Sequence, residues 1–303
     1  MRAAFSSALI ALAKADPNVL LLTGDHGYAL FDEFRHMCPG QYINAGIAEQ
    51  NMVGMAAGLA RTGFRPIVYG LSAFIPIRVL EQIKLDVAHD RLPVIFIGDG
   101  AGFVYSHLGT SHQSTEDIAC ARSVPELQVY SPSDEFEMQL CMRHAYDSCA
   151  SVYLRMGKSD LGVIHQQLPE VDLGGLINVK RGASNGICFI ATGSLLSCAL
   201  DIAKFTYPEA SVWSVPFIKP INKSQVSEIC RLSQCVVTFE EHSINGGLGS
   251  LIAEISTEHS PVRILRIGVS DRYSQHCGTY EYLRKEHGLD RHSIEKQLLA
   301  FLS

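Results

Sequence analysis

The residue best placed to do chemistry is Glu49, an acid between a short apolar segment and a helix-forming series. Residues 43–46 end in a glycine, and residues 47–60 are rich in Ala, Met, Leu, Glu and Gln. This pattern puts Glu49 in the first turn of a helix that leaves a buried strand. A carboxylate there can accept hydrogen bonds from free N–H groups of its own helix. It can also act as an acid or a base toward a ligand, and the residues alone leave both interpretations open.

Phe74 and His112 are two further candidates, because each lies in a polar or glycine-containing turn after a strand. Phe74 precedes Pro76 at an expected helix start, near the carboxyl edge of a sheet, where ligands bind in α/β folds. It can equally be a core aromatic. His112 lies in the Gly-, Ser- and Thr-rich segment 109–115, where an imidazole can face a cleft or simply lie on the surface.

A regular alternation of helices and strands has to position these residues. The apolar segments are mostly continuous runs of Val, Ile, Leu and Tyr, which is typical of parallel strands covered on both faces. We expect strands at 18–22, 41–44, 66–71, 93–98, 127–130 and 152–155, and helices at 1–14, 47–62, 77–88, 114–122 and 133–146. The pattern predicts a doubly wound α/β sheet.

A second α/β series follows a stretch in which the periodicity weakens. Between residues 157 and 185, Gly, Pro, Gln and Asp accumulate, as is usual at a domain boundary. Strands are then expected at 187–193, 211–215, 235–239 and 262–266, and helices at 225–232, 247–256 and 291–302. We therefore predict two doubly wound sheets, in domains 1–165 and 185–303 joined by a linker at 166–184.

Composition excludes several classes of function. The chain has 303 residues, 47% of them hydrophobic, and a net charge of −6 with acids and bases interspersed; it lacks the basic surface of a nucleic-acid or membrane binder. The longest early apolar run, residues 8–13, is too short to span a bilayer. Nine scattered cysteines without a C-x-x-C pair indicate reduced thiols and no metal site. We expect a soluble, cytoplasmic protein.

The segment from Asn44 to Val68, NAGIAEQNMVGMAAGLARTGFRPIV, is similar to the pyrimidine-binding domain of the transketolase family of thiamine-diphosphate enzymes. The resemblance implies that Glu49 hydrogen-bonds N1′ of the cofactor's aminopyrimidine. This contact favours the imino tautomer, so that N4′ can remove the proton from C2 of the thiazolium. The segment VTFEEHSINGGLGS, residues 237–250, resembles the family's carboxy-terminal domain. The acids and histidine of that segment are expected to be structural.

The resemblance also suggests roles for residues around the cofactor. It implies that Phe74 stacks on the pyrimidine and that Arg78 lines the same site, although Arg78 could instead pair with Glu81 or with an acid on a neighbouring helix. Asp25, at the end of the first strand, is expected near the cofactor, with a turn aspartate as the alternative. The loop containing Gly109 to Ser114, GTSHQS, resembles the family's GxTHQ loop.

Two residues are implied to touch the substrate. His112 is expected to contact the oxygen of the carbon under attack and to handle protons there. Arg155 matches an arginine that grips an anionic substrate group, or it is a strand-end residue in a structural ion pair. Relatives commonly carry Gly-Glu-Asp-Gly before the histidine loop, whereas this chain has Ser106-His107-Leu108-Gly109. The resemblance therefore does not identify the ketose.

The diphosphate-binding half of such an enzyme is missing from the sequence. The triplet Gly98-Asp99-Gly100 resembles the start of the thiamine-diphosphate signature, but no Asn-Asn pair follows it. We therefore expect the small, carboxy-terminal subunit of a split transketolase, inactive alone. A separate partner subunit would bind the diphosphate and Mg²⁺ in an α₂β₂ heterotetramer. The implied reaction transfers a two-carbon ketol unit from a ketose donor to an aldose acceptor in carbohydrate metabolism.

Three other interpretations remain. The chain could be the β subunit of a 2-oxo-acid dehydrogenase, or part of a 1-deoxyxylulose-5-phosphate synthase-like enzyme. The loop GTSHQS and the helix containing AEQNM fit transketolases better than dehydrogenase β chains, and synthases usually carry both halves on one chain. A non-catalytic scaffold of the same fold is the third alternative. The joint presence of Glu49, Phe74 and His112 argues against that alternative.

Overall fold

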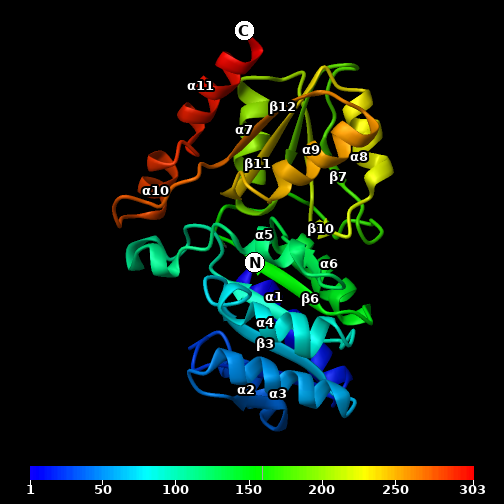
Figure 1. The fold of residues 1–303 in the computed structure, drawn as a ribbon, viewed down its shortest axis with the longest axis vertical. Coiled ribbons are helices and arrows are strands. Elements are labelled where there is room, and N and C mark those ends of the chain that lie inside the picture. Colours follow the sequence, from blue (N-terminus) through cyan, green and yellow to red (C-terminus); the bar gives the residue numbers. More distant parts are fainter. Residues whose placement is uncertain (159) are drawn as a thin grey trace.

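The computed structural model describes residues 1–158 and 160–303, which form two α/β domains (Figure 1). The first domain is built on a seven-stranded sheet with the order β10-β5-β6-β4-β3-β1-β2, parallel except for β10 against β5. Its strands in chain order are β1 (Val19–Thr23), β2 (Tyr42–Asn44), β3 (Arg65–Leu71), β4 (Ile95–Asp99), β5 (Gln128–Tyr130), β6 (Val152–Met156) and β10 (Phe217–Lys219).

Helices cover both faces of this sheet, as the continuous apolar strands predict. One face packs against α1 (Arg2–Ala15), α2 (Asp32–Met37) and α6 (Glu135–Asp147). The other packs against α3 (Glu49–Arg61), the segment containing α4 (Leu80–Gln82), and α5 (Asp117–Ser123). Local signals fix the helix ends: α6 begins after Asp134, whose side chain accepts hydrogen bonds from the N–H groups of Phe136 and Glu137, as expected of an N-cap aspartate.

The second domain has a five-stranded sheet of order β12-β11-β8-β9-β7, in which β7 runs antiparallel to β9. Its strands are β7 (Ile177–Lys180), β8 (Ile187–Ala191), β9 (Ser211–Ser214), β11 (Cys235–Ser243) and β12 (Arg263–Val269). Its helices are α7 (Leu196–Phe205), α8 (Lys223–Arg231), α9 (Leu248–His259), α10 (Tyr280–Glu286) and α11 (Arg291–Leu302). The predicted class of two doubly wound sheets is confirmed.

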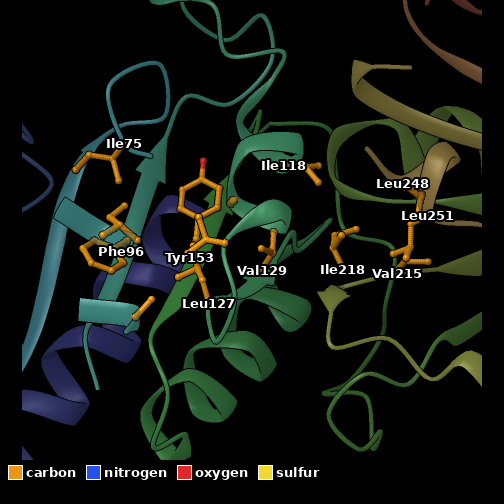
Figure 2. Packing of buried hydrophobic residues seen from close by; sticks show 14 of the residues in the cluster. Ile75, Phe96, Ile118, Leu127, Val129, Tyr153, Val215, Ile218, Leu248 and Leu251 are labelled. Atoms are coloured by element: carbon orange, nitrogen blue, oxygen red, sulfur yellow. The ribbon is translucent and has the colours of Figure 1, made fainter. Parts of the chain in front are cut away.

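The two domains share a strand and a hydrophobic core. Strand β10 leaves the second domain and pairs with β5 of the first, with Phe217 opposite Tyr130. One buried cluster runs from Phe96 and Tyr153 in the first domain to Val215 and Leu248 in the second (Figure 2). Strand β7 lies inside the segment predicted as a linker. The domains are therefore not separated by a free linker, because sheet pairing and core packing both cross between them.

Two composition-based expectations can be compared with the structure. None of the nine cysteines forms a disulfide within the described residues. No helix in the described ranges is both long and apolar enough to cross a membrane.

Candidate active site

Glu49 is the first residue of α3, and its side chain is only 5% exposed. It follows Gly46, which adopts a left-handed backbone conformation with φ of +73°, one that glycine reaches without steric cost. The Glu49 carboxylate turns across to the segment after β3, where its Oε1 accepts a hydrogen bond from Arg78 Nη1 at 3.0 Å. The structure thus presents this acid toward the end of β3, two strands away from β2 in the sheet.

Phe74 and Arg78 lie together in the segment that follows β3. The backbone N–H of Arg78 donates to the carbonyl oxygen of Phe74 at 3.0 Å, which folds the segment into a turn. The Arg78 guanidinium lies 3.9 Å from the centroid of the Phe74 ring, a cation–π geometry. Arg78 therefore contacts both the acid and the aromatic residue, so the alternative pairing of Arg78 with Glu81 is not what the structure shows.

Two histidines complete the group around Phe74. The ring of His112 meets it edge to face at a centroid distance of 5.4 Å, and the ring of His26 lies at 6.5 Å. His26 Nε2 is buried without a hydrogen-bond partner among the described residues. Strands β1, β3 and β4 are parallel neighbours, so segments that follow them meet at one edge of the sheet.

His26 was not predicted to be a site residue, although its position directly after a strand indicates one. It lies in Gly24-Asp25-His26-Gly27 directly after β1, and β1 pairs with β3, the strand that precedes Phe74. Polar residues after adjacent parallel strands share the carboxyl edge of the sheet. The observed pairing of β1 with β3 therefore brings His26 toward Phe74.

Asp25 forms the contacts of a turn. It adopts a left-handed conformation with φ of +61°, which aspartate tolerates better than most residues. Its N–H donates to Asn44 Oδ1 at 3.2 Å, and its Oδ1 accepts from Tyr28 at 3.3 Å and from Asn44 Nδ2 at 3.4 Å. The carboxylate is exposed and lies next to His26 in the chain, so it belongs to the same edge without joining the central group.

Arg155 lies elsewhere, and the structure does not fit the expectation that it binds substrate. Its side chain is 1% exposed, and Nε donates to Asp117 Oδ2 at 2.8 Å. Nη2 donates to the carbonyl oxygens of Ser114 and Glu241 at 3.3 and 2.7 Å. Burial alone would lower the pKa of this guanidinium, but the Asp117 carboxylate raises it. The alternative, a structural ion pair at a strand end, describes the geometry.

The acids and histidine of β11 are buried and engaged in contacts within the fold. Glu240 accepts from the N–H groups of Leu248 and Gly249 at 2.7 and 2.8 Å, which fixes the first turn of α9. His242 Nε2 accepts from the N–H of Ala119 at 3.2 Å, and burial lowers the pKa of this histidine to about 4. The Glu240 contacts lie within the second domain, whereas the contact of His242 with Ala119 joins the two domains. Both kinds of contact support the structural role expected for the segment.

No cluster of three His, Cys, Asp or Glu residues able to hold a metal ion occurs within residues 1–158 and 160–303.

Comparisons with known proteins account for both domains. The family model for the transketolase pyrimidine-binding domain matches residues 1–163, and the one for the transketolase C-terminal domain matches residues 175–294. The chain belongs to the transketolase family. It is 33% identical to an apulose-4-phosphate transketolase subunit of Actinobacillus succinogenes, over 84% of this chain and 83% of that protein.

Two further similarities describe how much of a transketolase the chain represents. It is 34% identical to 1-deoxy-D-xylulose-5-phosphate synthase of Mannheimia succiniciproducens, over 89% of this chain but only 43% of the synthase. A solved structure titled as a split gene transketolase, inactive beta4 tetramer, superposes with a TM-score of 0.90 at 30% identity, covering 99% of this chain and 97% of that one. The chain corresponds in extent to one subunit of a split transketolase.

Proposed function

We propose that this chain is the small subunit of a thiamine-diphosphate-dependent split transketolase. Its reaction would transfer a two-carbon ketol unit from a ketose to an aldose. The proposal rests on the observation that the side chains of Glu49, Arg78, Phe74 and His112 lie together at one edge of the sheet. The similarity to a protein named as an apulose-4-phosphate transketolase subunit supports the same assignment.

The residues at this edge fit the aminopyrimidine half of the cofactor. A nearly buried carboxylate can exchange a hydrogen bond with a ring nitrogen, and an aromatic ring can stack on a heteroaromatic one. His26 Nε2, which has no hydrogen-bond partner among the described residues, offers a further polar atom. When bound, thiamine diphosphate supplies the nucleophilic carbon that carries the ketol unit. In this assignment Glu49 holds a proton at the pyrimidine, Phe74 and Arg78 orient the ring, and Asp25 lies beside it.

His112 is assigned to the substrate side of the site. Its imidazole sits on the edge of Phe74 and is half-buried, with Nδ1 3.0 Å from the hydroxyl of Ser111. A histidine in such a loop can give or take a proton at a substrate oxygen near neutral pH. In this assignment Glu49 acts on the cofactor and His112 acts on the sugar substrate.

A partner subunit is part of the proposal. It would carry the diphosphate- and Mg²⁺-binding domain, in an α₂β₂ assembly with active sites between subunits. The related structure titled as an inactive beta4 tetramer supports the need for a second kind of chain. The unpaired cysteines support a reducing, cytoplasmic setting.

The proposal is tested by calorimetry with thiamine diphosphate and Mg²⁺, using this chain, a co-expressed diphosphate-domain subunit, and their mixture. We expect cofactor binding and exchange of the C2 proton only in the mixture. Glu49→Gln should slow that exchange by about a hundredfold, while Glu81→Gln, at an exposed acid nearby, should not. A mixture that neither binds the cofactor nor responds to Glu49→Gln would refute the assignment and leave the scaffold alternative.

A synthase-like activity is the second candidate, because the chain is similar to 1-deoxy-D-xylulose-5-phosphate synthase. A synthase of that kind consumes pyruvate with loss of CO₂, whereas a transketolase moves a ketol unit between sugars without releasing CO₂. Pyruvate-dependent CO₂ release by the mixture would favour the synthase. Transfer from a ketose to an aldose without CO₂ would favour the transketolase.

A further inference from the structure

The loop that carries His112 is held at both ends by the second domain. We call residues 103–115 the His112 loop. At its start, the N–H of Phe103 donates to Glu241 Oε1 at 2.7 Å; at its end, the carbonyl of Thr115 accepts from the N–H of Ser243 at 2.6 Å. The approach of Glu241 needs a glycine beside it, since a Cβ on Gly102 would lie 2.1 Å from Glu241 Oε1. Both contacts anchor the loop to strand β11.

A third contact reaches the residue next to the histidine itself. The hydroxyl of Ser274, in the segment between β12 and α10, donates to Gln113 Oε1 at 2.7 Å. The same hydroxyl oxygen lies 2.9 Å from His287 Nε2. A serine hydroxyl has one hydrogen and can still accept. Because that hydrogen is directed to Gln113, His287 Nε2 must be the donor to Ser274. A directed chain of hydrogen bonds thus runs from His287 through Ser274 to Gln113.

The environment of His287 fixes its position and lowers its pKa. Its side chain is 1% exposed, and its ring stacks on Phe103 at a centroid distance of 4.8 Å and an interplanar angle of 21°. Burial lowers the pKa of His287, Arg272 lowers it further, and Glu286 opposes them. Its Nδ1 is buried and has no partner in the described part of the chain. The ring therefore offers one N–H group, the one directed to Ser274.

We propose that Ser274 and His287 are positioning residues for His112, acting through Gln113. This inference rests on the proposed function, in which His112 acts on the substrate. The second domain then contributes to the site in the first domain, because it sets where the imidazole stands relative to Phe74. A displacement of about 1 Å in such a group can cost up to about a hundredfold in rate. The loss of one anchor out of three is expected to cost less.

The test compares Ser274→Ala, His287→Leu and His287→Gln in the enzyme reconstituted with its partner subunit. Hydroxypyruvate serves as donor, because loss of CO₂ from it leaves the same two-carbon unit. Ser274→Ala and His287→Leu should each lower kcat by roughly tenfold while the Kd for thiamine diphosphate changes less than about twofold. His287→Gln places an amide N–H where Nε2–H was and should restore kcat to within about threefold of the unaltered enzyme.

Matched controls separate positioning from general damage to the domain. Ser270→Ala and His292→Leu change exposed residues of the same types in the same domain, and they should leave kcat unaltered. The inference is overturned if Ser274→Ala and His287→Leu keep kcat within about twofold, or if His287→Gln loses as much activity as His287→Leu. The second result would show that the ring packing matters and its N–H group does not.

A second measurement needs no activity and uses this chain alone. Hydrogen exchange of the backbone amides in residues 108–113 should become several-fold faster in Ser274→Ala, because local opening of the loop is easier when an anchor is lost. Unaltered exchange there would also overturn the inference. Amide exchange can become faster as expected while the reconstituted protein shows no cofactor chemistry. In that case the anchoring of the His112 loop by Ser274 is supported and the proposed function is refuted.

Discussion

The Arg78 guanidinium donates to Glu49 Oε1 at 3.0 Å, although the Arg78 side chain is 46% exposed and that of Glu49 only 5%. The half-exposed Arg78 side chain therefore holds the nearly buried Glu49 carboxylate in place. The same guanidinium lies 3.9 Å from the centroid of Phe74. The acid and the aromatic residue that we assign to the pyrimidine are thus fixed relative to each other by a single side chain before any ligand arrives.

Arg78→Met tests whether this arrangement prepares the site for the cofactor. We expect the affinity of the reconstituted enzyme for thiamine diphosphate to fall about tenfold, since hydrogen bonds to charged groups contribute roughly 1.5–3 kcal/mol. Calorimetry with Mg²⁺ measures it. Arg91→Met is the control, because Arg91 pairs with Glu126 at 3.1 Å on an exposed surface. Tighter binding in Arg78→Met would mean that the arginine competes with the cofactor.

Phe74→Leu tests the stacking role of the aromatic ring. Leucine keeps the apolar volume but loses the π face, so the affinity for thiamine diphosphate should drop roughly fivefold, about 1 kcal/mol. Phe74→Tyr should retain most of it. Phe205→Leu, which alters a phenylalanine exposed by 73% in the second domain, should have no effect. Equal affinities for Phe74→Leu and the unaltered enzyme would remove Phe74 from the cofactor site.

The gathering of Glu49, Phe74 and His112 could be anticipated because each follows a strand of one parallel sheet. Such strands deliver the residues after their carboxyl ends to a common edge, and the apolar runs identified those strands with ends close to the observed ones. Which residue pairs with which could not be anticipated in the same way. The sequence left Arg78 open to Glu81 or to an acid on a neighbouring helix, and only the folded structure shows that its partner is Glu49, on α3.

Two features, strand β10 and the choice of partner for Arg155, could not be predicted from the sequence for a different reason. Strand β10 has three residues and pairs with β5, more than eighty positions earlier in the chain, so neither length nor periodicity marks it. Arg155 ends a buried strand, and its partner Asp117 lies 38 residues before it. An arginine at a strand end looks the same in sequence whether it faces an anion or an internal carboxylate. Only the position of Asp117, at the start of α5, beside this strand decides between the two.

The Arg155–Asp117 pair should be a large contributor to the free energy of unfolding when one partner alone is removed. Arg155→Met leaves the Asp117 carboxylate, 0% exposed, without its guanidinium, and breaking a buried pair in this way costs about 3–5 kcal/mol. Adding Asp117→Asn removes the stranded charge and should recover part of the loss. Urea unfolding of the unaltered protein, Arg155→Met, Asp117→Asn and the double variant measures the free energy of coupling between the two side chains. Additive losses would contradict a direct ion pair.

His165 should make the stability depend on pH, because its pKa is raised in the folded protein. Its Nε2 lies 2.8 Å from Glu137 Oε1. Burial by itself would lower the pKa of His165, but the hydrogen bond to Glu137 and the charges of Glu137 and Asp134 outweigh it and raise the pKa above 6.5. A histidine with a raised native-state pKa stabilises the fold fully below the pKa of the unfolded chain, about 6.5. That stabilisation is lost as the pH rises through the native-state value.

His165→Gln should therefore lower the free energy of unfolding by about 1 kcal/mol more at about pH 5.5 than at about pH 9. Urea unfolding at the two pH values measures the difference. His36→Gln, at an exposed histidine of the first domain, should show no such dependence and serves as the control. If His165→Gln costs the same at both values, the contact with Glu137 is an uncharged hydrogen bond and the imidazole is neutral throughout. A larger loss at the higher pH would reverse the sign of the linkage and exclude a raised pKa.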